Sequence, residues 1–279
     1  MTDKKLLRDL QRFALEIRLA TIEELGSLGF GHVGGSLSMA DAMAVLYGSV
    51  MNIDPKRPQW EDRDKFISSK GHAGPVVYAT LALKGYFPKE DLMTLNKPDT
   101  HYPSHCDRKK TVGVDMTTGS LGQGTSLACG MALGDKLKGR PSRVFVMVGD
   151  GECNEGQVWE AAMFAAGKKL DNMTWFIDNN GKQLDGYVKD ILDTGDLAKK
   201  FEAFGFKTVR INGNDVEQIY DAIAIPHEGQ PLAIVMDTVK GKGVKDVEDT
   251  VMNHSMTMKP EVWAKWADDL RAELAAFGK

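Results

Sequence analysis

The sequence predicts an α/β protein in which a parallel β-sheet is covered by helices on both faces. Short apolar runs typical of strands alternate with stretches whose apolar residues recur at helical spacing. The clearest run, residues 143–148, is apolar after its first position, as expected for a strand buried on both faces. The other predicted strands are 65–68, 173–177, 206–211 and 232–236.

Helices are predicted before, between and after these strands. Leu6, Leu10, Phe13, Ile17 and Ala20 mark one amphipathic helix over about residues 5–28. Further helices are expected over about 38–47, with Ser38 as N-cap, and over 72–83, 124–138, 155–168, 216–223 and 263–277. Residues 88–116 are expected to form a long surface loop, and no linker or repeat interrupts a single domain over residues 1–279.

Composition restricts the classes of function. The 279 residues carry a formal net charge of -4 without a long block of like charge, which argues against a nucleic-acid or membrane-surface binder. The N-terminus leads from Met1 into an amphipathic stretch and not into an apolar signal core, and three scattered cysteines indicate a reducing cytoplasm. A nucleophilic role for Cys106 beside His105 is the weaker interpretation, because sequence neighbours rarely form a catalytic pair.

Polar loops follow two consecutive central strands, and we expect them to meet at one edge of the sheet. One loop contains Gly149-Asp150-Gly151, and 27 residues separate it from Asn179-Asn180 in the other. A carboxylate and an amide oxygen suit magnesium, which prefers about six hard oxygen ligands and often keeps phosphate and water among them. Glycine permits close approach of the backbone, and the N-terminus of the following helix favours an anion. The two loops together therefore predict a site for a divalent metal and a diphosphate.

This spacing matches the motif of thiamine-diphosphate enzymes, and further segments resemble the transketolases in particular. In chain order they are Gly31-His32-Val33-Gly34-Gly35-Ser36, Ser69-Lys70-Gly71-His72-Ala73, the run from Thr117 to Gly124, Gly149 to Gly156, and Lys240 to Val244 with His254 fourteen residues after Lys240. The resemblance implies the thiamine-diphosphate-binding fold. It covers nearly the whole chain, but only the diphosphate-binding half of a full-length transketolase.

The resemblance also implies roles for individual residues. The metal ligands would be Asp150, Asn180 and the backbone carbonyl of Lys182. Glu155 resembles the buried glutamate that supports a catalytic glutamate across the dimer interface. Cofactor contacts would come from His72, Gly119, Ser120, Leu121, Asp150, Gly151, Glu155, Asn180, Lys182, Lys240 and His254.

Four histidines would surround the reactive carbon of the cofactor and handle substrate hydroxyls: His32, His72, His105 and His254. Histidine suits this task because it donates or accepts a proton near neutral pH. The segment around His105 departs from the family pattern, so His101 remains its competitor, and Asn253-His254-Ser255 replaces the Trp-His-Gly that the family often has.

The implied reaction is transfer of a two-carbon ketol unit from a ketose to an aldose, with thiamine diphosphate and Mg²⁺, for which Ca²⁺ or Mn²⁺ can substitute. The glutamate that activates the cofactor lies in a following domain in transketolases, so the resemblance implies a separate C-terminal partner subunit in an α2β2 assembly. The substrates would be sugar phosphates, or branched or sulfonated sugars. The alternatives are a subunit of a deoxyxylulose-phosphate synthase-like or dihydroxyacetone synthase-like enzyme, and a non-catalytic paralogue.

Overall fold

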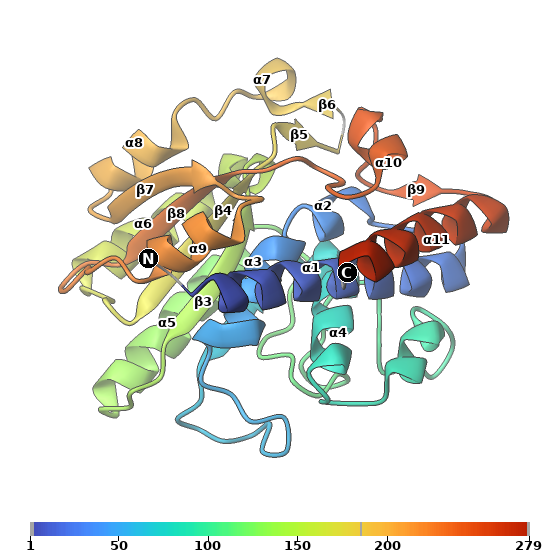
Figure 1. The fold of residues 1–279 in the computed structure, drawn as a ribbon. Helices are drawn as coiled ribbons and strands as arrows, with labels where there is room; N and C mark the ends of the chain where they lie inside the picture. The colour runs from blue at the N-terminus through green and yellow to red at the C-terminus, as the bar shows by residue number, and fades with distance from the viewer. Residues whose placement is uncertain (1–2, 185, 278–279) are drawn as a thin grey trace.

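The computed structural model describes residues 3–184 and 186–277 of the chain (Figure 1). The predicted domain over 1–279 also covers residues 1–2, 185 and 278–279, which lie outside the described residues. The main sheet has five parallel strands in the order β2-β3-β4-β8-β7. These strands are β2 (Lys65–Ser68), β3 (Val144–Gly149), β4 (Met173–Asn179), β7 (Lys207–Asn212) and β8 (Leu232–Asp237). This confirms the predicted α/β fold with a parallel sheet.

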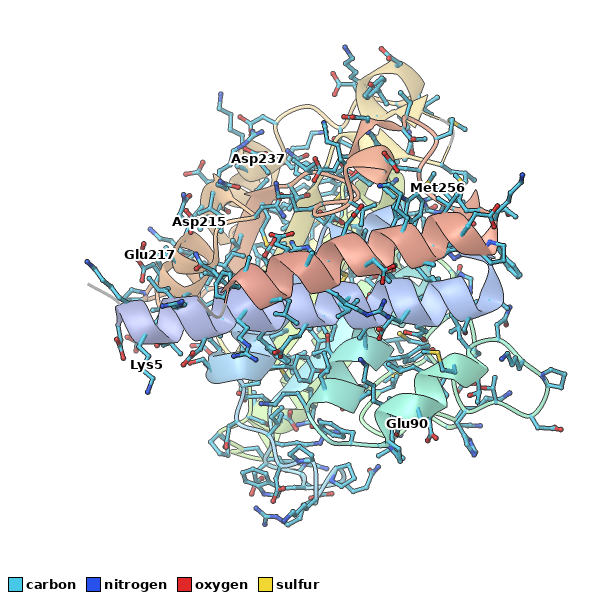
Figure 2. All side chains as sticks on the ribbon, turned by 45° about the vertical axis from the view of Figure 1, so that its right-hand side comes forward. Lys5, Glu90, Asp215, Glu217, Asp237 and Met256 are labelled. Carbon is cyan, nitrogen blue, oxygen red and sulfur yellow. The ribbon has the colours of Figure 1, made fainter. Side chains whose placement is uncertain are left out.

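Helices cover both faces of the sheet (Figure 1). One face is packed by α1 (Lys4–Leu28), α3 (Ala40–Val45), α4 (Gly74–Leu83) and α9 (Val216–Ile223), and the other by α5 (Gln123–Leu137), α6 (Gly156–Gly167) and α8 (Leu197–Ala203). The long helix α11 (Pro260–Phe277) lies alongside α1 (Figure 2). The shorter helices are α2 (Gly34–Leu37), α7 (Val188–Ile191) and α10 (Lys245–Asp249).

Alternation along the strands explains why both faces are apolar. In β3, Phe145 and Met147 join the core under α1 and α4, whereas Val144, Val146 and Val148 join the core under α5 and α6. Successive side chains of a strand point to opposite faces, so a run that is apolar at every position must be buried on both sides. The continuous run in the sequence therefore has the structural meaning that was predicted for it.

Two local predictions need correction. Ser38 is not a helix N-cap, because it lies at the C-terminal end of α2. Its hydroxyl donates to Asp178 Oδ2 at 2.6 Å and so belongs to a buried polar network. Residues 88–116 contain no strand or α-helix, only a short 3₁₀ segment at Lys89–Thr94. This segment is nevertheless not a simple surface loop, because several of its side chains enter the core: Leu92, Leu95, Tyr102 and Cys106.

Two small antiparallel ladders lie near the carboxyl ends of the strands, and one of them connects distant segments. β1 (Phe30–Gly31) pairs with β9 (Met256–Thr257), and β5 (Lys182–Gln183) pairs with β6 (Gly186–Tyr187). The first pair places the loop after Gly31 beside the segment before Met256. In the described part of the chain, no helix combines the length and the apolar character needed to cross a membrane.

Candidate active site

A cavity of about 260 Å³ opens at the carboxyl edge of the sheet. Parallel strands direct their carboxyl ends to one edge, so loops that are distant in sequence meet there. Register pairs Gly149 of β3 with Asp178 of β4, and Asn179 with Asp237 of β8. The cavity is lined by His32, Gly35, Lys70, His72, His105, Gly119, Leu121, Gly149, Asp150, Gly151, Glu152, Asn180, Lys182, Gln183, Leu184, Lys240 and His254.

Asp150 and Asn180 lie on neighbouring loops of this edge, as their positions in the sequence predicted. The Asp150 carboxylate accepts the Gly151 N–H at 2.7 Å through Oδ1 and the Gly181 N–H at 2.5 Å through Oδ2. Because each carboxylate oxygen has two lone pairs, both oxygens retain one for a cation. Burial and the negative charge of Asp178 raise the Asp150 pKa to about 6, so a bound cation would stabilise the ionised form.

The backbone of Lys182 is hydrogen-bonded to two other residues that line the cavity. Its N–H donates to Asn180 Oδ1 at 3.1 Å, and its carbonyl accepts the Lys240 ammonium at 2.9 Å. Lys240 is 3% exposed, and burial together with the charge of Lys70 lowers its pKa to about 8. A buried ammonium beside a second ammonium is stabilised by an anion. The cavity therefore presents carboxylate and amide oxygens for a metal and ammonium groups for a diphosphate.

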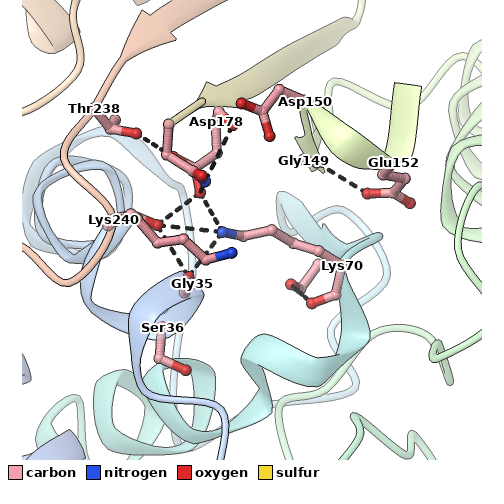
Figure 3. A network of polar contacts seen from close by, with 12 residues as sticks. Gly35, Ser36, Lys70, Gly149, Asp150, Glu152, Asp178, Thr238 and Lys240 are labelled. Carbon is pink, nitrogen blue, oxygen red and sulfur yellow. Dashed lines mark hydrogen bonds and ion pairs between the residues drawn. The ribbon is translucent and has the colours of Figure 1, made fainter. Parts of the chain in front are cut away.

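A buried ion pair forms the floor beneath these groups (Figure 3). Lys70 donates to Asp178 and, at 2.7 Å, to the Gly35 carbonyl; Ser38 and Thr238 also donate to Asp178. Burial alone would raise the Asp178 pKa, but the charge and hydrogen bonds of Lys70 hold it below its ordinary value. The pair joins the glycine loop after His32 to the end of β4.

The four predicted histidines meet in the same cavity. The His32 ring centroid lies 5.4 Å from that of His72, 5.6 Å from that of His105 and 5.1 Å from that of His254. His72 and His254 are 4.6 Å apart. His101 is exposed and does not line the cavity, so the structure places His105, and not its competitor, next to the other three.

The surroundings of all four histidines favour the neutral form. Burial is the main cause that lowers each pKa, and it is supplemented for His32, His72 and His254 by nearby cationic groups. The His254 pKa falls to about 3, with Lys240 as its strongest charged neighbour. A neutral imidazole has one donor and one acceptor nitrogen, so the cluster is suited to hold hydroxyl groups and exchange protons with them.

Two predicted residues do not line the cavity. Ser120 is exposed next to Gly119 and Leu121, which both line it. Glu155 is exposed in this chain and not buried; it precedes α6, and a Cβ added at Gly122 would lie 3.1 Å from the Glu155 Cβ. Both residues therefore lie on the outer side of the loops that form the cavity.

Sequence reasoning assigned no role to Lys70, Glu152 or Gln183, which line the cavity. Glu152 is 3% exposed and accepts hydrogen bonds from two other loops, through Ser69 Oγ and Gly122 N at 2.8 Å, and from Gly149 N at 3.0 Å at the start of its own loop. Burial raises its pKa despite these donors. The available signal was an acidic residue directly after Gly149-Asp150-Gly151, but nothing local shows that it points inward.

The cysteines lack the features of nucleophiles. All three are free and buried. Burial raises the pKa of Cys106 and of Cys129 to about 12 and that of Cys153 well above its ordinary value. Since the thiolate is the reactive form, the structure favours a packing role for Cys106 over the alternative of a nucleophile beside His105.

The donor set fits magnesium with a diphosphate better than a metal held by protein alone. Among the described residues, no group of three or more His, Cys, Asp or Glu side chains is arranged to hold a metal ion. Asp150, the Asn180 amide oxygen and the Lys182 carbonyl would leave coordination positions for phosphate oxygens and water, as magnesium prefers.

Comparison with known proteins identifies the family of the chain. Residues 10–270 match the family model described as "Transketolase, thiamine diphosphate binding domain". The chain is 48% identical over 267 residues to the 6-deoxy-6-sulfo-D-fructose transketolase subunit SqwG of Clostridium sp. (strain MSTE9), covering 95% of this chain and 97% of that one. It is 41% identical over 219 residues to an apulose-4-phosphate transketolase subunit of Actinobacillus succinogenes, covering 78% and 79% of the two chains.

A solved structure shares the fold and shows how much of a longer enzyme the chain represents. The transketolase from Leishmania mexicana superposes with a TM-score of 0.83 at 27% identity, covering 96% of this chain but 46% of that one. The chain thus spans about half of a full-length transketolase, whereas it spans nearly all of the first separate subunit named above. The chain belongs to the transketolase family and carries that family's thiamine-diphosphate-binding domain.

Proposed function

We propose that this chain is the diphosphate-binding subunit of a thiamine-diphosphate- and magnesium-dependent transketolase that transfers a two-carbon ketol unit from a ketose to an aldose. The observation that carries the proposal is the placement of four neutral histidines in one cavity with Asp150 and Asn180. The four histidines can hold a polyhydroxylated substrate, and Asp150 with Asn180 can hold a metal-bound diphosphate.

In this proposal Asp150, Asn180 and the Lys182 carbonyl hold the metal, and Lys240 binds the diphosphate. The bound cofactor supplies the nucleophilic carbon on which the two-carbon unit is carried. His32, His72, His105 and His254 bind the hydroxyl and carbonyl oxygens of the sugar and hold or move protons at those oxygens. Their neutral state matters, because a histidine that is already protonated cannot accept a proton.

A separate partner subunit completes the site in this proposal. The outer face of α5 and α6 exposes large apolar side chains, namely Leu127, Leu137, Met163 and Phe164. A Cβ added at Gly130 or Gly134 of α5 would meet no atom within 4 Å, so a partner can approach this helix closely. Apolar exposure on this scale is typical of an interface.

The same face is continuous with the cavity. Helix α5 begins directly after Leu121 and Gly122, and α6 begins directly after Glu155. A partner seated on α5 and α6 would therefore reach the cavity mouth and bury Glu155, as the resemblance implies for that residue. We place the C-terminal subunit there, in an α2β2 assembly with two such chains.

The substrate is proposed to be a ketose with an anionic group at its far end, a phosphate or a sulfonate. The relative with 48% identity is named for 6-deoxy-6-sulfo-D-fructose. A ketose panel that pairs a sulfonated donor with its phosphorylated analogue, assayed with chain and partner together, would separate the two. Conversion of pyruvate instead of a ketose would indicate the deoxyxylulose-phosphate synthase-like alternative.

The dependence on a partner is tested by purifying the chain alone and assaying ketol transfer with thiamine diphosphate and magnesium. We expect no turnover until the partner is added. Activity of a preparation that mass spectrometry shows to be free of other polypeptides would contradict the two-subunit proposal.

The metal site is tested with Asp150→Ala in the reconstituted enzyme. The change removes a ligand and the charge that balances the metal, so we expect calorimetry to show no magnesium-dependent cofactor binding. Asp269→Ala, which removes an exposed carboxylate on α11, should bind like the wild type. Unchanged affinity of the Asp150 variant would reject the ligand assignment.

A further inference from the structure

We infer that Glu152 is a positioning residue that fixes the relative arrangement of the three loops forming the diphosphate end of the cavity. The inference rests on the proposed function, because the loops matter through the cofactor they would hold. It adds a residue to which neither the sequence motifs nor the family resemblance gave a role.

Two hydrogen bonds of Glu152 come from other loops, and the third comes from the start of its own loop. Ser69 precedes the His72 loop, Gly122 ends the glycine-rich loop that contains Gly119 and Leu121, and Gly149 precedes Asp150. One carboxylate oxygen, Oε1, accepts from both Ser69 and Gly122, and the other, Oε2, accepts from Gly149. Figure 3 shows Glu152 beside Gly149, on the side of the cavity opposite Lys240.

The bonding pattern requires a carboxylate. Two of the three partners are backbone N–H groups, which can only donate. A glutamine of nearly the same shape has one acceptor oxygen and one NH₂ group. Whichever way its amide is turned, the NH₂ faces the N–H of Gly122 or of Gly149, and that buried donor loses its partner.

The His72 loop and the glycine-rich loop also touch each other so closely that a small displacement of one moves the other. A Cβ added at Gly124 would lie 2.6 Å from Ser69 Cα, and one at Gly71 would lie 2.7 Å from Gly119 N. Loss of the central acceptor therefore shifts the loops together and moves the His72 loop, the Gly119 loop and Asp150 out of register. A site that must be reordered on binding has a lower affinity than one already in place.

The decisive variant is Glu152→Gln, compared with Ser69→Ala and with the exposed control Glu202→Gln on α8. Calorimetry on the chain with its partner, at saturating magnesium, measures the Kd of thiamine diphosphate. We expect Glu152→Gln to raise Kd about tenfold. Ser69→Ala should have a smaller effect because both backbone donors keep their acceptor, and Glu202→Gln should have none.

Amide hydrogen exchange on the chain alone provides a readout that does not depend on activity or cofactor. In Glu152→Gln we expect faster exchange in the segments around Gly122 and Gly149, with no change in α1 and α11. Unchanged exchange there, together with a Kd within about twofold of the wild type, would overturn the inference. A wild-type enzyme that does not bind thiamine diphosphate would instead overturn the proposed function, and the exchange result would still decide the role of Glu152.

If Glu152→Gln fails to fold, Ser69→Ala decides the question by the same two measurements, since it removes one donor to the same oxygen. Exchange in the segment from Ser69 to His72 and Kd that both equal the wild-type values would then reject the role. Faster exchange confined to the three loops would support it.

Discussion

Glu24 offers a sharp test of how burial controls ionisation in this fold. It lies within α1, is completely buried, and neither carboxylate oxygen has a hydrogen-bond partner among the described residues. Burial raises its pKa well above the usual 4.5. Burial in the folded chain therefore favours the neutral acid form of Glu24.

The size of the effect follows from proton linkage. Above pH 4.5 the unfolded chain releases the Glu24 proton while the folded chain keeps it, so stability falls as pH rises, until the pH reaches the folded pKa. Each pH unit between the unfolded and the folded pKa costs up to about 1.4 kcal/mol of stability. Glu24→Gln keeps the shape but does not titrate.

Urea unfolding followed by circular dichroism at several values between pH 5 and 8 measures the difference between Glu24→Gln and wild type. We expect the variant to gain stability relative to the wild type as pH rises from 5, by up to about 1.4 kcal/mol per pH unit. The adjacent Glu23→Gln is the matched control. Hydrogen bonds and charges of Lys89 and Arg271 outweigh burial and lower the Glu23 pKa, so its loss should destabilise the chain at neutral pH. A Glu24→Gln difference that does not change with pH would refute the reasoning.

Two further predictions concern the floor of the cavity and the proposed partner face. Lys70→Met leaves the Asp178 carboxylate buried without its ion-pair partner, so we expect the free energy of unfolding measured by chemical denaturation to fall by about 3–5 kcal/mol. The control Lys265→Met removes an exposed ion pair and should change that free energy by less than about 1 kcal/mol. Equal effects of the two variants would contradict the role of the buried pair. Leu127→Arg places a charge on the exposed face of α5 and should abolish co-purification of the partner without lowering the Tm of the chain. The control Ala264→Arg, on the exposed side of α11, should not affect assembly. If the Leu127 variant still binds the partner, the exposed face of α5 is not the interface.

The sequence predicted the order of strands and helices because periodicity is a local property. The apolar run at 143–148 reports burial on both faces, and the five predicted strands lie within two residues of the observed ones at each end. The loops after β3 and β4 were also predictable as neighbours, since consecutive parallel strands present their carboxyl ends to the same edge. Asp150 and Asn180 could thus be paired from the sequence.

Other features depend on contacts that leave no local trace. His32 and His254 come together because β1 pairs with β9 and because Gly34 donates to the Asn253 carbonyl, and no pattern in either segment specifies that pairing. Which of His101 and His105 lines the cavity depends on Cys106, the residue after His105. The Cys106 N–H donates to the Gly71 carbonyl, and the Cys106 carbonyl accepts the Thr118 N–H. Those bonds hold His105 against the cavity.

What the sequence by itself determined is the family, the α/β sheet and the chemical character of the loops at its carboxyl edge, since each is written in residue types at short spacing. Only the tertiary structure decided which side chains face one another. It turned Glu152 inward to join three loops, placed Lys70 beneath Asp178, and left Glu155 on the surface where a partner can reach it. The physical reason is that burial and hydrogen bonding depend on long-range packing, which the local sequence does not encode.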